Sequence, residues 1–204
     1  LALLGWHATG DQEMYSMQEL IEQFSLERVS KSGAKFDYEK GKWFNHQYLQ
    51  LRSNEELAEQ FMPYLEKAIG DGLLAIDKAT VAKVIGLTKD RVNFVSELWE
   101  QVNFFFVAPT EYDEKSLKKR WKEDSPKHMT EMLALLEAHD DWSAEGLDNL
   151  IMPWIAEKEY GVGIVMNAFR ICLVGAARGP HIWNITDVLG KEETLARVRT
   201  ALEK

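Results

Sequence analysis

Arg170 stands out in this sequence because it is a charged residue within a mostly apolar stretch. The stretch runs from Ile164 to Val174, and Gly175 follows it. An unpaired buried charge is costly, so the guanidinium needs a carboxylate, a backbone carbonyl or a phosphate as its partner. A structural pair is the more common outcome for such an arginine, and a bound anion is the alternative.

Clusters of basic residues could offer further contacts to an anionic partner. They are Lys31, Lys35, Lys40 and Lys42; Lys89 and Arg91; and Lys115, Lys118, Lys119, Arg120 and Lys122. The net charge of -9 argues against a nucleic-acid-binding domain, in which basic residues usually predominate. Recognition needs only a local patch, however. The simpler interpretation of each cluster is a solvated surface of mixed charge.

Lys89 and Arg91 differ from the other basic residues because we expect them in the first turn of a helix. Thr88 can cap this helix, which we expect to run to about Phe104. A helix start that carries an arginine is a suitable place to meet a phosphate or a base edge. A surface pair with an acidic neighbour explains the two residues equally well.

Motifs of catalysis are missing from the sequence. We find no glycine-rich phosphate loop, no paired-histidine metal motif and no nucleophile elbow. The run from His139 to Asp141 is more typical of a helix end than of a metal site. Cys172, the single cysteine, excludes an internal disulfide, and we interpret it as a core thiol. The sequence therefore predicts no active site of its own.

The elements that position these residues are predicted to be helices throughout, in two or three small packed units. Two capping boxes begin at Ser16 and Ser53. Further helix starts are predicted at Asp37, Asp77, Ser125-Pro126 and Ser143, and helix ends at Gly86, Gly175 and Gly190. Pro63 implies a kink or a break into two helices, and Gly70-Asp71-Gly72 a turn. Pro180 restarts a short helix after Gly175.

Aromatic residues recur at helical spacing after Asp37. The spacing places Trp43, Phe44, Gln47, Tyr48 and Leu51 on one broad face. We interpret this face as part of the core, and a platform for stacking bases is the less favoured alternative.

Size and composition fit a folded protein of one large domain or two small ones. The chain has 204 residues, of which 46% are hydrophobic and 28% charged. No apolar run reaches the ~20 residues of a membrane span, and we expect no signal peptide. The chain opens on Leu1 without a methionine or a cap, so we expect a fragment of a longer protein, and the single cysteine suits the cytoplasm.

Several motifs, taken in order, resemble the C-terminal portion of bacterial glutamyl-tRNA synthetases. They are Leu3-Leu4-Gly5-Trp6, Ser30-Lys31-Ser32-Gly33-Ala34-Lys35-Phe36-Asp37, Arg170-Ile171-Cys172-Leu173-Val174-Gly175, Gly179-Pro180-His181-Ile182-Trp183-Asn184-Ile185, and Leu189-Gly190-Lys191-Glu192. The catalytic signatures of this family, His-Ile-Gly-His and Lys-Met-Ser-Lys-Ser, do not occur.

The resemblance implies an all-α anticodon-binding region in two helical subdomains, preceded by the end of a stem-contact region. The expected boundaries are 1–52 for the stem-contact part and 53–112 and 113–204 for the subdomains, with a linker near 108–113. The implied partner is tRNA(Glu), with no DNA and no membrane. The parent enzyme, expected to be a monomer, would join glutamate to tRNA with ATP and Mg, whereas this fragment would hold no cofactor and be inactive alone.

The resemblance also implies roles for particular residues. Arg91 falls where the family reads the third anticodon base, which is C in tRNA for glutamate and G in tRNA for glutamine. Arg170, Gly179, Pro180 and Ile182 fall on the second subdomain's anticodon contacts. Family members often have Thr where this chain has Gly179, so a hydroxyl contact is lost or moved to the backbone. Backbone contacts to tRNA are expected from Lys89, Lys115, Lys118, Lys119, Arg120 and Arg178, the last of which could compensate for the missing hydroxyl.

A different class of function also fits a helical, acidic chain, namely a protein-interaction module without an RNA role. Salt-dependent binding to tRNA distinguishes the two, because only the anticodon-binding hypothesis predicts it.

Overall fold

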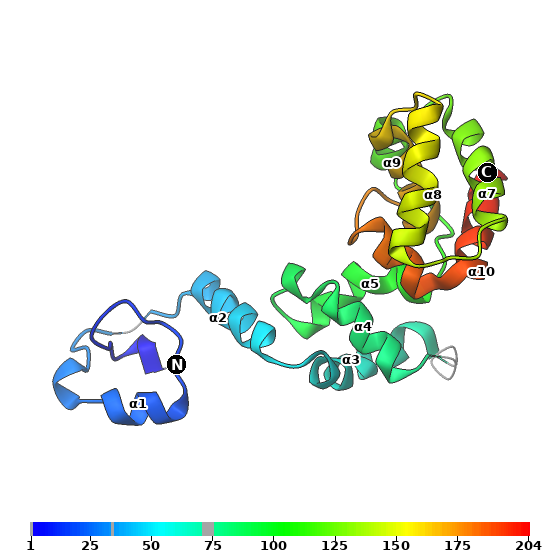
Figure 1. The fold of residues 1–204 in the computed structure, drawn as a ribbon. Coiled ribbons are helices and arrows are strands. Elements are labelled where there is room, and N and C mark those ends of the chain that lie inside the picture. The colour runs from blue at the N-terminus through cyan, green and yellow to red at the C-terminus, as the bar shows by residue number, and fades with distance from the viewer. Residues whose placement is uncertain (1, 34, 71–75) are drawn as a thin grey trace.

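The computed structural model of this chain describes residues 2–33, 35–70 and 76–204. These residues form α-helices and short 3-10 helices, together with an isolated antiparallel bridge between Trp6 and Val29. The predicted all-α fold is therefore confirmed. None of the described helices is both long enough and apolar enough to cross a membrane. Figure 1 shows a small N-terminal unit, a long helix that leads away from it, and two groups of helices beyond.

The N-terminal unit is organised around Trp6. Its elements are η1 (Ala2–Leu4), α1 (Met17–Gln23) and η2 (Leu26–Arg28). Trp6 is buried, and its ring centroid lies 6.4 Å from that of Tyr15 and 6.1 Å from that of Phe24. The predicted capping box at Ser16 is present, because Glu19 N–H donates to the Ser16 hydroxyl while Ser16 N–H donates to the Glu19 carboxylate.

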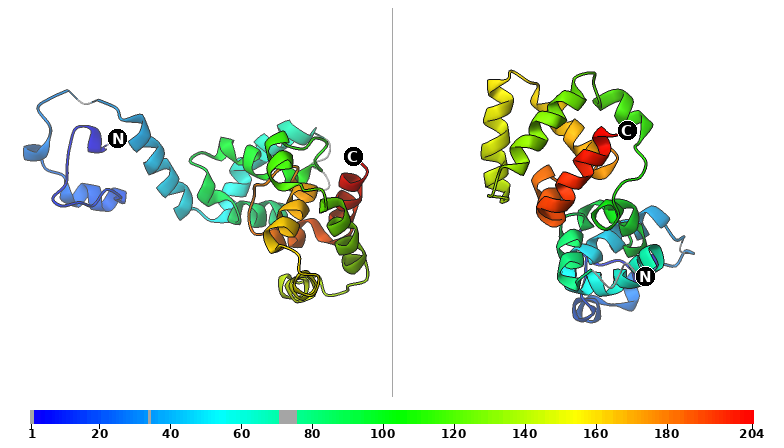
Figure 2. Two further views of the ribbon diagram at one scale, coloured as in Figure 1. Left: turned by 90° about the horizontal axis from the view of Figure 1, so that it is seen from above. Right: turned by 90° about the vertical axis from the view of Figure 1, so that its right-hand side faces the viewer.

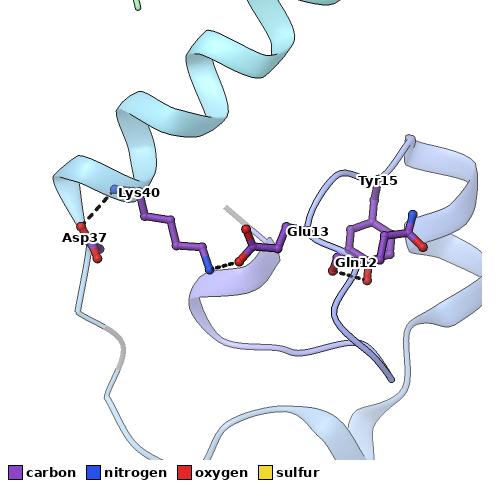
Figure 3. A network of polar contacts seen from close by, with 5 residues as sticks. All are labelled: Gln12, Glu13, Tyr15, Asp37 and Lys40. Atoms are coloured by element: carbon purple, nitrogen blue, oxygen red, sulfur yellow. Dashed lines mark hydrogen bonds and ion pairs between the residues drawn. The ribbon is translucent and has the colours of Figure 1, made fainter.

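Helix α2 (Tyr38–Leu51) connects this unit to the rest of the chain. Asp37 caps it as predicted, since its carboxylate accepts from the backbone N–H of Lys40 at 3.1 Å. The ammonium group of Lys40 pairs with the carboxylate of Glu13 (Figure 3). Lys40 therefore contacts the N-cap through its backbone and the N-terminal unit through its side chain. The left view of Figure 2 shows the N-terminal unit at the end of α2 that lies away from the other helices.

The aromatic residues of α2 do not form the core that their spacing predicts. Trp43 is 40% exposed, Tyr48 48% and Leu51 76%, whereas Leu49 is the buried residue of this helix. Helical spacing shows which side chains share a face, but not whether a neighbouring element covers that face. Helix α2 contacts the first group of helices through Leu49, which belongs to the hydrophobic core, and through polar side chains that are described below.

The first group of helices packs around the apolar faces of its own first two helices, α3 and α4. Its elements are α3 (Asn54–Ile69), α4 (Lys78–Gly86), η4 (Lys89–Arg91), η5 (Val95–Glu97) and α5 (Leu98–Phe106). Leu57, Phe61 and Ile85 are completely buried here. The predicted capping box at Ser53 and the predicted cap at Asp77 are both present.

Pro63 does not break α3 into two helices, so that alternative is wrong. The residue is exposed, and water can satisfy the carbonyl group that its missing N–H leaves free. The predicted turn at Gly70-Asp71-Gly72 lies largely outside the described residues.

The second group of helices follows the irregular segment 108–113, where the linker is predicted. Its elements are α6 (Glu114–Arg120), α7 (Ser125–Glu137), α8 (Ala144–Glu157), α9 (Val162–Val174) and α10 (Ile182–Leu202). Gly190 has non-helical angles (φ 74°), so α10 consists of two helices, as predicted. The predicted cap at Ser125 is one residue too late, because Asp124 is the N-cap and the Ser125 hydroxyl accepts from Lys122 N–H instead.

One continuous hydrophobic core runs through both groups of helices. It includes Leu98 and Phe104 from α5, Leu173 from α9 and Ile185 from α10. Helix α10 packs against α7, α8 and α9 and also reaches α4 and α5. The backbone of the linker is fixed as well, since Asp113 N–H donates to the Gly175 carbonyl at 2.8 Å. The domain boundaries at residues 52 and 112 stay a prediction.

Candidate nucleic-acid interface

The structure corrects the prediction of a single helix from Thr88 to Phe104. Lys89–Arg91 form a short 3-10 turn, residues 92–94 are not helical, and α5 begins only at Leu98. The Thr88 hydroxyl does not cap a helix but donates to the Val84 carbonyl, four residues earlier, at 2.9 Å. The carboxylate of Glu97 accepts from the N–H groups of residues 93 and 94, which starts a new helical segment there.

Polar side chains of α2 hold the backbone of the segment that carries Arg91. Gln50 donates to the Lys89 carbonyl at 2.8 Å, and the ring Nδ1 of His46 lies 2.8 Å from the Val92 carbonyl. Asn45 donates to the next carbonyl, that of residue 93. Three side chains of one helix therefore fix the conformation of residues 89–93.

Arg91 itself keeps its side chain at the surface. It is 41% exposed, and its nearest acidic partner is the neighbouring Asp90 at 4.0 Å, the limit of an ion pair. The nearby Lys89 is less available, because its ammonium group donates to the carbonyls of Gln50 and Arg52 at 3.4 and 3.2 Å. Of the two predicted RNA contacts in this turn, Arg91 is thus the more accessible, and Lys89 has a role in holding α2.

A carboxylate, a backbone carbonyl and a phosphate are the three partners predicted for Arg170. In the structure its partners are backbone carbonyls. Its Nη1 donates to the Pro180 carbonyl at 2.6 Å and to the Arg178 carbonyl at 3.2 Å. The residue is half-buried, and burial lowers its pKa, to which the charge of Arg91 adds a smaller effect in the same direction. Arg170 is thus held by the backbone of the loop that follows its own helix.

The loop from 175 to 181 lies against α5 and is fixed there by Arg178. The Arg178 guanidinium donates to the Glu100 carbonyl and to the side chain of Asn103, and it lies 5.6 Å from the centre of the Phe104 ring. Arg178 thus has a clear role within the protein, and its contact with an RNA backbone stays a prediction.

Gly179 allows the loop to approach both α5 and Arg170. Its φ is +106°, and a Cβ atom here would lie 3.1 Å from Phe104 Cζ and 3.6 Å from Arg170 Nη1. A threonine, frequent in the family that the sequence resembles, would be strained at this φ. Pro180 and Ile182 are buried, and the Pro180 carbonyl accepts from Arg170, so their contact with a ligand stays a prediction.

The basic helix α6 lies beside the same loop. The hydroxyl of Ser116 accepts from Ala177 N–H at 3.0 Å, which joins the two segments. The predicted contacts on this helix are all exposed, namely Lys115, Lys118, Lys119 and Arg120. A groove of about 750 Å³ lies between this helix, α5 and the loop, with Asn103, Ser116 and Arg178 in its wall. This helix thus contacts the loop that holds Arg170 through Ser116, and its exposed basic residues remain predicted RNA contacts.

The structure reveals one functional candidate that the sequence analysis did not identify. Arg197 in α10 is only 4% exposed, and it donates to the carbonyls of Phe104 and Leu173. The signal in the sequence that could have identified Arg197 is its position between Leu195 and Val198, on the apolar face of a helix. Arg199, two residues later, is exposed and pairs with a surface glutamate.

Neither a metal site nor a reactive thiol accompanies these basic residues in the described part of the chain. No group of three or more histidine, cysteine, aspartate or glutamate residues is placed to hold a metal ion in residues 2–33, 35–70 and 76–204. Cys172 is fully buried, as predicted, and burial raises its pKa to about 12. The arrangement can bind an electron-rich partner through guanidinium groups.

Comparison with known proteins identifies the family. The family model described as "Anticodon binding domain" matches residues 56–202. Curated glutamate–tRNA ligases are similar over the entire chain, among them those of Phocaeicola vulgatus, 57% identical, and Bacteroides thetaiotaomicron, 56% identical. The chain covers 39% and 40% of these two relatives, or about two fifths of their length.

Solved structures give the same result for the fold. A crystal structure of a glutamate tRNA ligase from Elizabethkingia meningosepticum, in complex with its amino acid, matches with a TM-score of 0.90 and 37% identity. The match covers 100% of this chain and 39% of the other. A glutamate–tRNA synthetase from Elizabethkingia anophelis matches with a TM-score of 0.88 and 36% identity. This chain therefore belongs to the anticodon binding domain family.

Proposed function

We propose that this chain binds the anticodon loop of a tRNA that accepts glutamate, and that Arg91 and Arg170 contact bases of that loop. The observation that carries the proposal is that the fold holds both guanidinium groups in place: Arg91 is 41% exposed on a turn fixed by α2, and Arg170 donates to the Pro180 and Arg178 carbonyls. The two arginines come from separate elements, η4 and α9, in a chain whose net charge is -9.

The donors that remain on these side chains suit the reading of bases. Arg91 is exposed, so its planar guanidinium can donate two parallel hydrogen bonds to the edge of a base. Nη1 of Arg170 already donates to two carbonyls, which fixes the orientation of its other donors. Bases in a single-stranded loop expose their edges to such contacts. A good bidentate contact contributes about 1 to 3 kcal/mol of discrimination between bases.

Helix α6 supports the proposal with a sequence-independent contribution. The helix contacts the loop that holds Arg170 through Ser116, and its lysines are exposed, so they are free to neutralise phosphates. Phosphate contacts fix the position of the RNA without reading its sequence. We therefore assign base recognition to the two arginines and backbone contact to α6.

The remaining activity belongs to a longer protein in this proposal. The relatives are named glutamate–tRNA ligases, and this chain spans only about two fifths of their length. We propose that the parent protein joins glutamate to tRNA(Glu) in the cytoplasm as a monomer, with ATP and Mg bound outside this chain. The comparisons do not favour the alternative of a protein-interaction module.

The test is the affinity of the chain for a glutamate tRNA transcript at two salt concentrations. Changing the third anticodon base from C to G should weaken binding about tenfold, because the acceptors N3 and O2 on the Watson–Crick edge of cytosine are replaced by the N1–H and N2–H donors of guanine. The variant Lys118→Gln should instead weaken the binding of both transcripts equally and reduce the dependence on salt. Equal affinity for the two transcripts would contradict the proposed reading of the base.

A further inference from the structure

Arg197 joins the two groups of helices through their backbones. Its Nη1 donates to the Phe104 carbonyl of α5 at 2.5 Å and to the Leu173 carbonyl of α9 at 2.8 Å. Its Nε donates to Glu193, one turn earlier in α10, at 2.7 Å. With a side chain only 4% exposed, Arg197 makes these contacts inside the protein, whereas Glu193 is 44% exposed.

The two carbonyls are ones that their own helices cannot satisfy. Phe104 lies in the last turn of α5 and Leu173 in the last turn of α9, and the last four carbonyls of a helix lack an intrahelical donor. A cation near a helix C-terminus also interacts favourably with the helix dipole. One guanidinium therefore stabilises two helix ends at once and holds them at a fixed distance from each other.

Both of these helix ends support the proposed recognition site. Helix α9 carries Arg170, one turn before Leu173. The ring of Phe104 contacts the guanidinium of Arg178 and limits the space at Gly179, so it supports the loop to which Arg170 donates. Any change in the separation of α5 and α9 would move Arg170 relative to this loop.

The start of α5 is connected to the segment that carries Arg91. The carboxylate of Glu97, the residue before α5, accepts from the N–H of Asn93 at 2.8 Å and from that of Phe94 at 3.3 Å. Val92 alone separates these residues from the turn that ends with Arg91. Helix α5 is thus in contact with the segment of Arg91 at its beginning and with the support of Arg170 at its end.

We propose that Arg197 is a positioning residue for base recognition, which fixes the separation of Arg91 and Arg170 by tying α5 to α9. This inference rests on the proposed function. The inference goes beyond the proposed function because Arg197 lies inside the protein and contacts no RNA. Arg197 nevertheless controls how well the third anticodon base is discriminated.

The test compares Arg197→Met with the matched control Arg199→Met. Methionine keeps an unbranched apolar side chain and removes every donor. Arg199 lies on the same helix, but it is 52% exposed and pairs with Glu137 at 2.6 Å on the surface. For each variant, affinities for the C and G transcripts are measured well below its unfolding temperature, so that loss of stability alone does not change their ratio.

We expect the ratio of the two affinities to fall about tenfold in Arg197→Met, the size of one bidentate contact, and to stay unchanged in Arg199→Met. The salt dependence should not change in Arg197→Met, because no phosphate contact is removed. In a chain that already carries Arg91→Ala, Arg197→Met should have no further effect on the ratio.

A folded Arg197→Met chain with the wild-type ratio would overturn this inference. Should that variant not fold, Glu193→Gln decides instead, because it leaves Arg197 in place and removes only the charge that orients it. Glu193→Gln should lower the ratio by a smaller factor, and a wild-type ratio would again overturn the inference. A wild-type chain without any preference between the transcripts would show that the proposed function itself has failed.

Discussion

Replacing Gly179 with alanine should destabilise the chain and weaken its binding of tRNA together. The φ of Gly179 is +106°, a conformation that residues with a side chain rarely adopt. The added Cβ would lie 3.1 Å from Phe104 Cζ and 3.4 Å from Ile185 Cδ1, which is tighter than ordinary contact for the first of these atoms. Both neighbours are buried, so neither can move freely.

The expected loss follows from three contributions. The strained backbone costs about 1 to 3 kcal/mol, and overpacking against a buried ring about 1 to 3 kcal/mol more. The lower entropy of the unfolded chain offsets about 0.4 to 1 kcal/mol. The net loss is about 3 kcal/mol, and at ~2 to 4 °C per kcal/mol for a chain of this size the unfolding temperature should fall by roughly 6 to 12 °C.

Gly190→Ala is the control for Gly179→Ala, since Gly190 also has a positive φ (+74°) but no atom within 4 Å of its hypothetical Cβ. It should show the cost of strain alone, with unchanged affinity for tRNA. Gly179→Ala should lower the affinity as well, because a displaced loop removes the carbonyls that hold Arg170. A Gly179→Ala chain as stable as wild type, or one that binds tRNA like Gly190→Ala, would refute this reasoning.

Three further predictions concern the helices around the site. Ser53→Ala removes the capping box of α3 and should cost about 1 kcal/mol in thermal unfolding, and an unchanged unfolding temperature would contradict this. Cys172, with a pKa raised to about 12 by burial, should resist iodoacetamide at pH 8 until the chain unfolds, whereas modification of the folded chain would show that the thiol is accessible. Hydrogen bonds from Ser116 lower the pKa of Asp113 below its ordinary value of 3.8, so its stabilising contribution is complete above that pH and lost as the pH falls below it. Unfolding between pH 2 and 5 should therefore depend less on pH in Asp113→Asn, and an unchanged dependence would exclude this contribution.

Local signals in the sequence predict most of the helix boundaries, because a cap or a stop involves residues only a few positions apart. Ser53 and Asp77 both cap the helices expected of them, and Gly175 and Gly190 both take the positive φ that ends a helix. Ser125 and Thr88 do not cap the helices expected of them: the Ser125 hydroxyl accepts from Lys122 N–H, and the Thr88 hydroxyl donates to a carbonyl of the preceding helix. A residue with two possible partners needs the structure to decide between them.

Contacts between distant segments cannot be predicted from such signals. The aromatic face of α2 has the spacing of a core face, but what packs against the segment of Arg91 is the polar group of Asn45, His46 and Gln50. Arg197 was not identified because its partners are carbonyls, 24 and 93 residues away, which any residue type can supply. The sequence therefore indicates the candidate arginines, while their arrangement depends on the packing of the helices.

The most direct test of the proposed function is a double-mutant cycle between Arg91 and the third anticodon base. Affinities of the wild-type and Arg91→Ala chains are measured for glutamate tRNA transcripts that carry C or G at this base. If Arg91 reads the base, the change from C to G weakens wild-type binding about tenfold and has no effect on the Arg91→Ala chain. The same loss in both chains, or no loss in either, would contradict base reading by Arg91.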